Sequence, residues 1–185
     1  MNPKVTLQTN NGTIAQTHLV TQEHISAYCK TGIAAYLDHY THLWKNGDPS
    51  PYFNQYYQPA SVKTDLKNPD FIHGIISIEG ERIGIFKLDL SRSHPEFFPG
   101  KTLFVEKLYL AKTATGCGLG TALMHQFYDW AQELNLKGIW LETMLKGPAR
   151  NFYIQNGFQY LGPTAVPYPQ VLEGERAMWI MGREL

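Results

Sequence analysis

The chain has 185 residues, of which 43% are hydrophobic and 13% aromatic, and this composition is typical of a globular domain that buries its own core. Its 16 Lys and Arg residues balance its 16 Asp and Glu residues, so the formal net charge is zero. The balance argues against a nucleic-acid-binding protein and against a protein that binds anionic membrane surfaces, because both need clustered positive charge.

Cysteine usage and hydropathy indicate the compartment. Cys29 and Cys117 are far apart and lack the spacing of metal ligands, whereas small secreted domains usually carry more cysteines. Residues 1–8 lack the apolar core of a signal peptide, and no apolar run approaches the roughly 20 residues that span a bilayer. We therefore expect a soluble, cytoplasmic protein with one domain over residues 1–185.

The N-terminal part predicts a strand and a long helix. Residues 13–20 form the first expected strand, and Thr21 can cap a helix that reaches about Trp44. One apolar stripe at helical spacing supports this helix: Ile25, Tyr28, Cys29, Ile33, Tyr36, Leu37 and Tyr40.

A hairpin follows an aromatic segment. Residues 52–57 are rich in Tyr and Phe, and a short helix is expected around residues 61–66. Two β-branched runs, residues 71–78 and 82–90, flank a Glu-Gly-Glu turn, which predicts two antiparallel strands.

The second half predicts a strand, a helix and a parallel strand. A strand over residues 103–110 leads into a glycine turn, and residues 139–143 form a buried strand after the intervening helix. The apolar face of that helix is made by Leu119, Leu123, Phe127, Trp130, Ala131 and Leu134.

Three short elements complete the prediction. Pro148 suits the first turn of a helix over residues 149–155, which Asn156 and Gly157 end. Residues 158–161 and 177–181 supply two more strands. The order indicates a mixed α/β fold with hairpins before and after one parallel crossover.

The glycine turn at residues 115–120 reads Thr-Gly-Cys-Gly-Leu-Gly and lies between a strand and a helix. Glycine lets the backbone take positive φ and come close to a ligand, and a helix start presents unpaired N–H groups and the positive end of a dipole. Such a turn suits an anionic group, and a pyrophosphate fits it.

Two nucleotide-binding motifs compete for this turn. A Walker P-loop needs Lys after its last glycine, but Thr121 follows Gly120, so phosphoryl transfer is not expected. The turn and Glu142, at the end of the next strand, also resemble a dinucleotide-binding motif, in which a glycine turn binds the pyrophosphate and an acidic residue binds the ribose. However, Thr121 stands where the third glycine of that motif belongs. An NAD-type oxidoreductase therefore remains an alternative.

Two segments taken together resemble the GNAT superfamily of acyl-CoA-dependent N-acetyltransferases. Residues 115–120 match the family's Gln/Arg-x-x-Gly-x-Gly/Ala signature except at the first position, and residues 152–158 match its Phe-Tyr-x-x-x-Gly-Phe element throughout. The resemblance is close over residues 103–162, and the flanking helices, hairpin and terminal strand follow the family's order.

The resemblance implies a twisted mixed sheet of about seven strands flanked by about four helices, with central strands that splay apart to admit acetyl-CoA. It implies that Tyr153 donates a proton to the departing thiolate of CoA. It also implies that the pantetheine arm and the pyrophosphate bind the backbone of Leu108, Tyr109, Leu110, Thr115, Gly116, Cys117, Gly118, Leu119, Gly120 and Thr121.

An attacking amine must lose a proton, and two carboxylates are candidates for the base. Glu106 is the first, because it lies on the strand that leads to the acetyl site and, by strand alternation, shares a face with Leu108 and Leu110. Glu142 is the second, because it ends the neighbouring strand. The competing interpretation of Glu106 is a solvent-facing strand residue or an ion-pair partner of Lys107 or Lys101.

Several other residues are open to two interpretations. Thr115 replaces the Gln or Arg that begins the signature in relatives, and Lys146 stands where many carry Asn, so it either approaches a phosphate or is solvated. His94 lies in a loop that an acceptor can pass, but the seven histidines show no metal-ligand spacing. Cys117 is expected to be a turn residue and Cys29 a core residue.

The aromatic segment has a packing interpretation and a binding interpretation. An aromatic wall attracts a cationic amine, whereas aromatic residues between helices more often pack in a core. The residues concerned are Tyr52, Phe53, Tyr56 and Tyr57.

The resemblance thus predicts an N-acetyltransferase that moves acetyl from acetyl-CoA, its co-substrate, to a primary amine by direct attack, without a metal. The expected acceptor is a polyamine-like or amino-acid-like small molecule or a peptide, and a homodimer is consistent with the family. A non-catalytic CoA-binding sensor is the second alternative.

Overall fold

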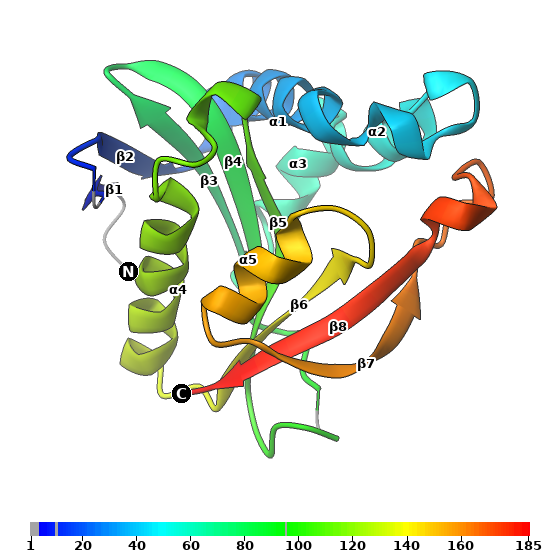
Figure 1. Cartoon of the computed structure of the whole chain (residues 1–185). Helices are drawn as coiled ribbons and strands as arrows, with labels where there is room; N and C mark the ends of the chain where they lie inside the picture. Colours follow the sequence, from blue (N-terminus) through cyan, green and yellow to red (C-terminus); the bar gives the residue numbers. More distant parts are fainter. Residues whose placement is uncertain (1–3, 10, 95) are drawn as a thin grey trace.

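The computed structural model describes residues 4–9, 11–94 and 96–185, and a single mixed sheet of eight strands runs through these residues (Figure 1). The strands are β1 (Lys4–Gln8), β2 (Ile14–Leu19), β3 (Phe71–Ile78), β4 (Glu81–Asp89), β5 (Leu103–Leu110), β6 (Gly138–Met144), β7 (Gln159–Ala165) and β8 (Ala177–Glu184). Their order across the sheet is β1-β2-β3-β4-β5-β6-β8-β7.

Helices cover both faces of this sheet (Figure 1). They are α1 (Ile25–Tyr40), α2 (Ser50–Tyr56), α3 (Pro59–Asp65), α4 (Leu119–Glu133) and α5 (Ala149–Gln155). One buried cluster joins α4 to the sheet through Leu123 and Phe127, and α5 packs against it. A second cluster joins α1, α2 and α3 to the opposite face through Tyr28 and Tyr52. Burial of these two apolar layers is the main source of stability.

The sheet divides in its middle. All neighbouring strands are antiparallel except β5 and β6, which are parallel. These two strands pair only from Leu103 with Ile139 to Val105 with Leu141, although β5 continues to Leu110 and β6 to Met144. The central strands therefore splay apart, as the sequence comparison with the family implied.

Local signals predicted most elements correctly. The bounds of β5 and α5 are those expected, and the hairpin of β3 and β4 is present. Thr21 begins a short 3-10 turn through a capping box with His24, and α1 then ends at Tyr40, earlier than the expected Trp44.

Within the described residues the sheet has eight strands and the fold five α-helices, where about seven and about four were expected. The additional strand is β1, a short edge strand paired with β2, and the additional helix is α2, whose start is held by the Ser50 N–H donating to Asp48 Oδ1 at 3.0 Å. β7 is longer than expected because it is an edge strand, where Pro163 needs no ladder hydrogen bond.

Candidate active site

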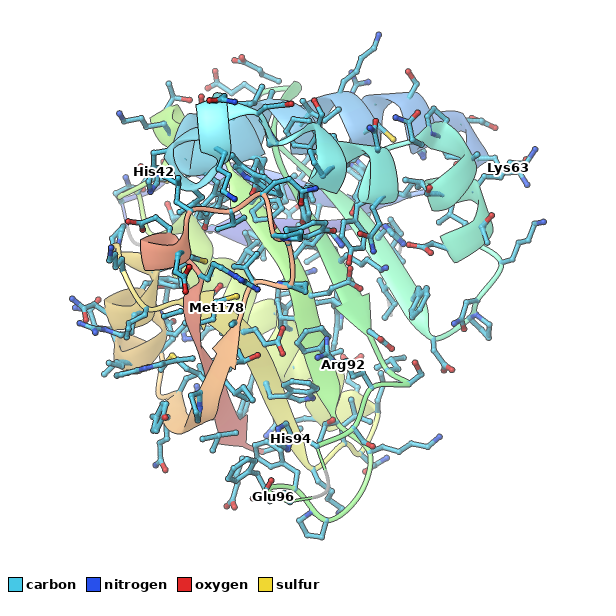
Figure 2. All side chains as sticks on the ribbon, turned by 90° about the vertical axis from the view of Figure 1, so that its right-hand side faces the viewer. His42, Lys63, Arg92, His94, Glu96 and Met178 are labelled. Atoms are coloured by element: carbon cyan, nitrogen blue, oxygen red, sulfur yellow. The ribbon has the colours of Figure 1, made fainter. Side chains whose placement is uncertain are left out.

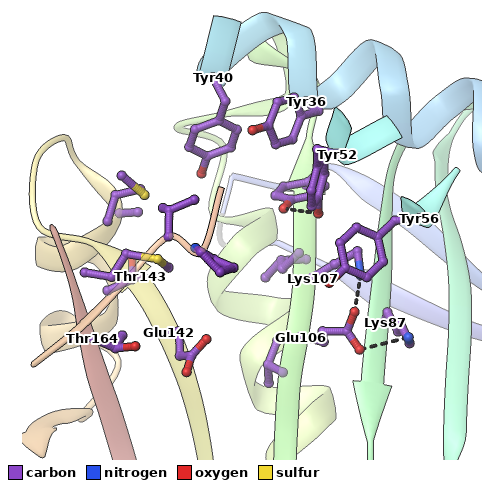
Figure 3. A pocket seen from close by; sticks show the side chains of 18 of the residues that line it. Tyr36, Tyr40, Tyr52, Tyr56, Lys87, Glu106, Lys107, Glu142, Thr143 and Thr164 are labelled. Atoms are coloured by element: carbon purple, nitrogen blue, oxygen red, sulfur yellow. Dashed lines mark hydrogen bonds and ion pairs between the residues drawn. The ribbon is translucent and has the colours of Figure 1, made fainter. Parts of the chain in front are cut away.

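A cavity of about 680 Å³ opens where β5 and β6 part (Figure 3). Tyrosines of α1 and α2 line one side, and residues of β6, α5 and the end of β7 line the other. Its size is that of an ordinary small-molecule site. Both candidate bases, Glu106 and Glu142, and the candidate acid, Tyr153, line this one cavity.

An irregularity in β5 decides where Glu106 points. Lys107 pairs with Lys87 and Val105 pairs with Leu88, so Glu106 is an extra residue at a β-bulge. Its carboxylate consequently lies beside the Lys107 ammonium, on the side of α2 and α3.

The expected shared face of Glu106, Leu108 and Leu110 is therefore wrong. Leu108 and Leu110 pack against the cluster beneath α4, on the other side of the sheet from the carboxylate. The bulge breaks the alternation that the prediction assumed.

Glu106 sits between two cations (Figure 3). Its Oε2 lies 2.9 Å from Lys87 Nζ, and its other carboxylate oxygen accepts a hydrogen bond from Lys107 Nζ. Burial raises the pKa of Glu106, but the two ammonium groups outweigh this and hold the pKa below its ordinary value. Glu106 is therefore ionised at neutral pH.

The ion pairs continue beyond Glu106. Lys87 also donates to Asp65 Oδ2 at 2.8 Å, and the Lys107 ammonium lies 3.9 Å from the centre of the Tyr56 ring. Burial lowers the pKa of Lys107 to about 8, despite the neighbouring carboxylate. Two lysines and two carboxylates thus form one compensated, half-buried network.

Glu142 has a different environment on β6. Its Oε1 accepts a hydrogen bond from Arg92 Nη2 at 3.1 Å, and its side chain is 27% exposed. The two candidate bases therefore face the cavity from the two strands that part; Glu106 is compensated by two lysines and Glu142 by Arg92.

Tyr153 lines the cavity from α5. Its ring packs against Phe152 and Phe158, with ring centres 5.0 Å and 5.7 Å apart. Burial raises the pKa of Tyr153, so its hydroxyl keeps its proton at neutral pH.

The glycine turn presents the start of α4. Gly118 is the N-cap, in the left-handed conformation with φ of 83°, and no side chain caps the helix. The N–H of Ala122 makes the first helical bond, to Gly118 O at 3.1 Å, so the N–H groups of Leu119, Gly120 and Thr121 precede the ladder. This is the arrangement that binds anions.

Two contacts shape this turn further. A Cβ on Gly120 would lie 3.0 Å from the Phe152 ring, so glycine permits α4 to approach α5 closely. The N–H of Thr115 already donates to Lys112 O at 3.2 Å, which leaves positions 116–121 as the candidates for phosphate binding.

The edge of β5 that faces the gap carries backbone groups suited to an extended ligand. The N–H of Ala111 donates to Ile83 O of β4 at 2.7 Å, so by alternation the backbone groups of Leu108 and Leu110 do not pair with β4. The carbonyl of Leu110 is bound by His39, which leaves its N–H and both groups of Leu108 for a ligand. Tyr109 is the exception among the three positions expected to pair with pantetheine, because its backbone groups face β4. Its side-chain hydroxyl forms a hydrogen bond with the Tyr52 hydroxyl at 2.8 Å.

Sequence reasoning missed the contribution of α1. His39 Nε2 donates to the carbonyl of Leu110 at 2.9 Å, and Asp38 Oδ2 accepts from the N–H of Lys112 at 2.8 Å. Adjacent residues of one helix thus hold the last residue of β5 and the first turn after it. No local pattern in the sequence indicates such a contact over more than 70 residues.

The aromatic segment divides between the cavity and the core. Tyr52 and Tyr56 line the cavity, whereas Tyr57 is 3% exposed and packs near Tyr28, and Phe53 packs against Tyr36.

The remaining candidate residues do not line the cavity. His94 packs its ring on Phe97 and Trp140, and Figure 2 shows it on the segment that follows β4. Lys146 pairs with Glu175 at 2.7 Å. Cys117 contacts Ala114 O within the turn, and Cys29 is buried.

Among residues 4–9, 11–94 and 96–185, no group of three or more His, Cys, Asp or Glu side chains is arranged to hold a metal ion. Within the same ranges no helix combines the length and the apolar character needed to cross a membrane.

Comparisons with known proteins agree with this geometry. A model of the acetyltransferase (GNAT) family matches residues 33–158. A PaiA N-acetyltransferase from Thermoplasma acidophilum, in complex with coenzyme A, superposes with a TM-score of 0.72 at 13% identity, over 92% of this chain and 99% of that one. RimJ from Mycobacterium smegmatis, in complex with CoA-disulfide, gives 0.68 at 16% identity, over 98% and 86%.

A third structure, ribosomal-protein-S5-alanine acetyltransferase from Vibrio fischeri, gives a TM-score of 0.68 at 15% identity, over 97% of this chain and 96% of that one. At these identities the likeness establishes a shared fold.

Proposed function

Because the chain belongs to the acetyltransferase (GNAT) family and is an acetyl-CoA-dependent N-acetyltransferase, we propose that it acetylates a primary amine of a small molecule or peptide by direct attack. The observation that carries the proposal is the meeting of Glu106, Glu142 and Tyr153, from three different elements, in the cavity between the parted strands. A base and an acid on one substrate-sized space are what amine acylation requires.

In this proposal, backbone groups bind acetyl-CoA. Acetyl-CoA brings a thioester whose carbonyl carbon accepts the amine. The N–H groups of positions 116–121 are proposed to bind its pyrophosphate, and Leu108 and Leu110 to pair with the pantetheine arm. Since these donors belong to the backbone, the Thr115 departure from the family signature leaves them intact.

Proton transfer is assigned to the cavity residues. An alkylammonium acceptor has no lone pair until it loses a proton, and Glu106, ionised between Lys87 and Lys107, takes that proton directly or through water. The amine nitrogen then bonds to the carbonyl carbon and loses its second proton to solvent, the carbon–sulfur bond breaks, and Tyr153 gives its hydroxyl proton to the thiolate. The proton held by Glu106 passes to solvent. Solvent returns a proton to Tyr153, whose raised pKa favours the neutral form.

A panel of amines tests the proposal. Purified chain, acetyl-CoA and single candidates from the polyamines, the amino acids and short peptides are mixed, and free thiol is followed. We expect release that needs both the chain and one class of amine. Tight CoA binding without thiol release on any amine contradicts the proposal.

A further inference from the structure

Arg92 is held at the cavity by its own backbone. Its N–H donates to Asp89 Oδ1 at 3.2 Å, and its carbonyl accepts hydrogen bonds from Thr102 Oγ1 at 3.1 Å and from Trp140 Nε1 at 3.3 Å. Both of these donor residues are buried. The residue therefore has a fixed position, although it lies on the segment after β4 (Figure 2).

The guanidinium group is fixed as well. It lies over the rings of Phe104 and Trp140, with its carbon 4.1 Å and 4.8 Å from the ring centres. Arg92 lines the cavity and its side chain is 45% exposed, which places the group at the mouth. Its ion pair with Glu142 uses one N–H donor, on Nη2. A guanidinium has five N–H donors in a planar fork, so others are left for a ligand.

We propose that Arg92 binds a carboxylate of the acceptor, so that the substrate is a primary amine that also carries a carboxylate, as an amino acid does. This inference rests on the proposed function and names its substrate class. A guanidinium already held over two rings loses little freedom when it binds a carboxylate through two parallel hydrogen bonds.

The charges around the cavity favour the same class. Lys87, Lys107 and Arg92 all line it, and each has a carboxylate partner within the chain. A polyamine brings several positive charges to a wall whose carboxylates are already compensated. A zwitterionic acceptor brings one charge of each sign, with its ammonium group directed to Glu106 and its carboxylate to Arg92.

The competing explanation is that Arg92 only orients Glu142. The two roles differ in their dependence on the substrate. Loss of a carboxylate-binding group raises KM for acceptors that carry a carboxylate and leaves others unaffected, whereas loss of an orienting group changes kcat for every acceptor.

The experiment compares each amino acid with its amide on the wild-type chain, on Arg92→Gln and on Arg92→Lys. We expect the wild type to prefer the acids, and Arg92→Gln to raise KM for the acids by about tenfold with little change for the amides. Arg92→Lys is expected to recover part of the loss, because it keeps the charge but not the fork. For each acceptor, the KM of the variant is divided by the KM of the wild type. This ratio cancels the intrinsic difference in amine pKa between an amino acid and its amide.

Arg82→Gln is the matched control, since Arg82 is exposed on β4 at the other end of the strand. Equal use of acids and amides by the wild type overturns the inference, and so does an equal loss on both by Arg92→Gln. Both results leave the proposed function standing. No thiol release with any amine overturns the proposed function itself.

Discussion

The role proposed for Tyr153 depends on a single oxygen atom. Its ring is packed by Phe152 and Phe158, so Tyr153→Phe removes the hydroxyl and keeps the packing. We expect kcat to fall by about 100-fold, within the range that general acids contribute, with KM for acetyl-CoA unchanged. Steady-state thiol release on the best amine measures both quantities.

Tyr160→Phe is the control for this change, because Tyr160 lies on β7 and is 50% exposed. Unchanged turnover in Tyr153→Phe would show that water protonates the thiolate, and Tyr153 would then be a packing residue.

Asp65 gives the stability of the chain a defined pH window. Burial alone raises its pKa, but the His73 ring, 3.5 Å from the carboxylate, and the hydrogen bond from Lys87 outweigh this and lower the pKa to about 2. A folded-state pKa below the ordinary 3.8 stabilises the fold at higher pH, and this stabilisation is lost as the pH falls towards 2.

Asp65→Asn is therefore expected to lower the free energy of unfolding at pH 6 by about 1 kcal/mol, allowing for partial exposure. The difference from wild type narrows between about pH 4 and pH 2. Urea unfolding at several pH values measures it, with Asp129→Asn, exposed on α4, as the control. If the difference in free energy of unfolding between wild type and Asp65→Asn did not change with pH, the Asp65 side chain would stabilise the fold by packing and not by its charge.

At the scale of elements, two glycines with the same backbone conformation allow the effect of backbone strain to be distinguished from an effect on ligand binding. Gly116 has φ of 78° and Gly12, in the hairpin of β1 and β2, has φ of 85°, and a Cβ meets nothing within 4 Å at either position. Alanine at each is expected to lower the free energy of unfolding by about 1–2 kcal/mol, the cost of the left-handed conformation.

Only Gly116→Ala is expected to weaken CoA binding, by about tenfold, because relaxation of the strained turn moves the amides that bind the pyrophosphate. Calorimetric titration with CoA measures the affinity of both variants. An equal effect of Gly12→Ala and Gly116→Ala on affinity would indicate a general loss of order and not a phosphate site at the turn.

Element prediction succeeded where the signal was local. The apolar run before the glycine turn predicted β5, and Pro148 with Asn156 and Gly157 predicted the ends of α5. The bulge at Glu106 has no such signal, because the extra residue is recognised only from the partner strand β4. A strand assigned correctly to the residue therefore still gave the wrong face for its carboxylate.

At the scale of the whole molecule, the site is completed by contacts between distant parts of the chain. Arg92 meets Glu142 across 50 residues, and His39 meets Leu110 across 71. The sequence motifs indicated the glycine turn and Tyr153 as candidate site residues, since each is carried by one segment. The charge partners of the acceptor cavity depend on the register of the sheet and the position of α1, which no single segment encodes.

The sheet is joined across its middle by few contacts. Strands β1 to β5 form one side and β6 to β8 the other, and three residue pairs from Leu103 with Ile139 to Val105 with Leu141 link them. A ligand that lies in the gap and binds the edge of β5 adds contacts between the two sides. We therefore expect binding of acetyl-CoA to stabilise the whole chain, with one cooperative unfolding transition.

A ligand that binds only the folded chain, at about 100 times its Kd, contributes about 2.7 kcal/mol. For a chain of this length, that raises Tm by about 5–10 °C. We expect this shift with acetyl-CoA and with CoA, a smaller shift in Gly116→Ala at the same concentration, and none with NAD. Differential scanning calorimetry gives the measurement. An equal shift with NAD would assign the turn to dinucleotides in general, and a shift that Gly116→Ala retains in full would place the pyrophosphate elsewhere.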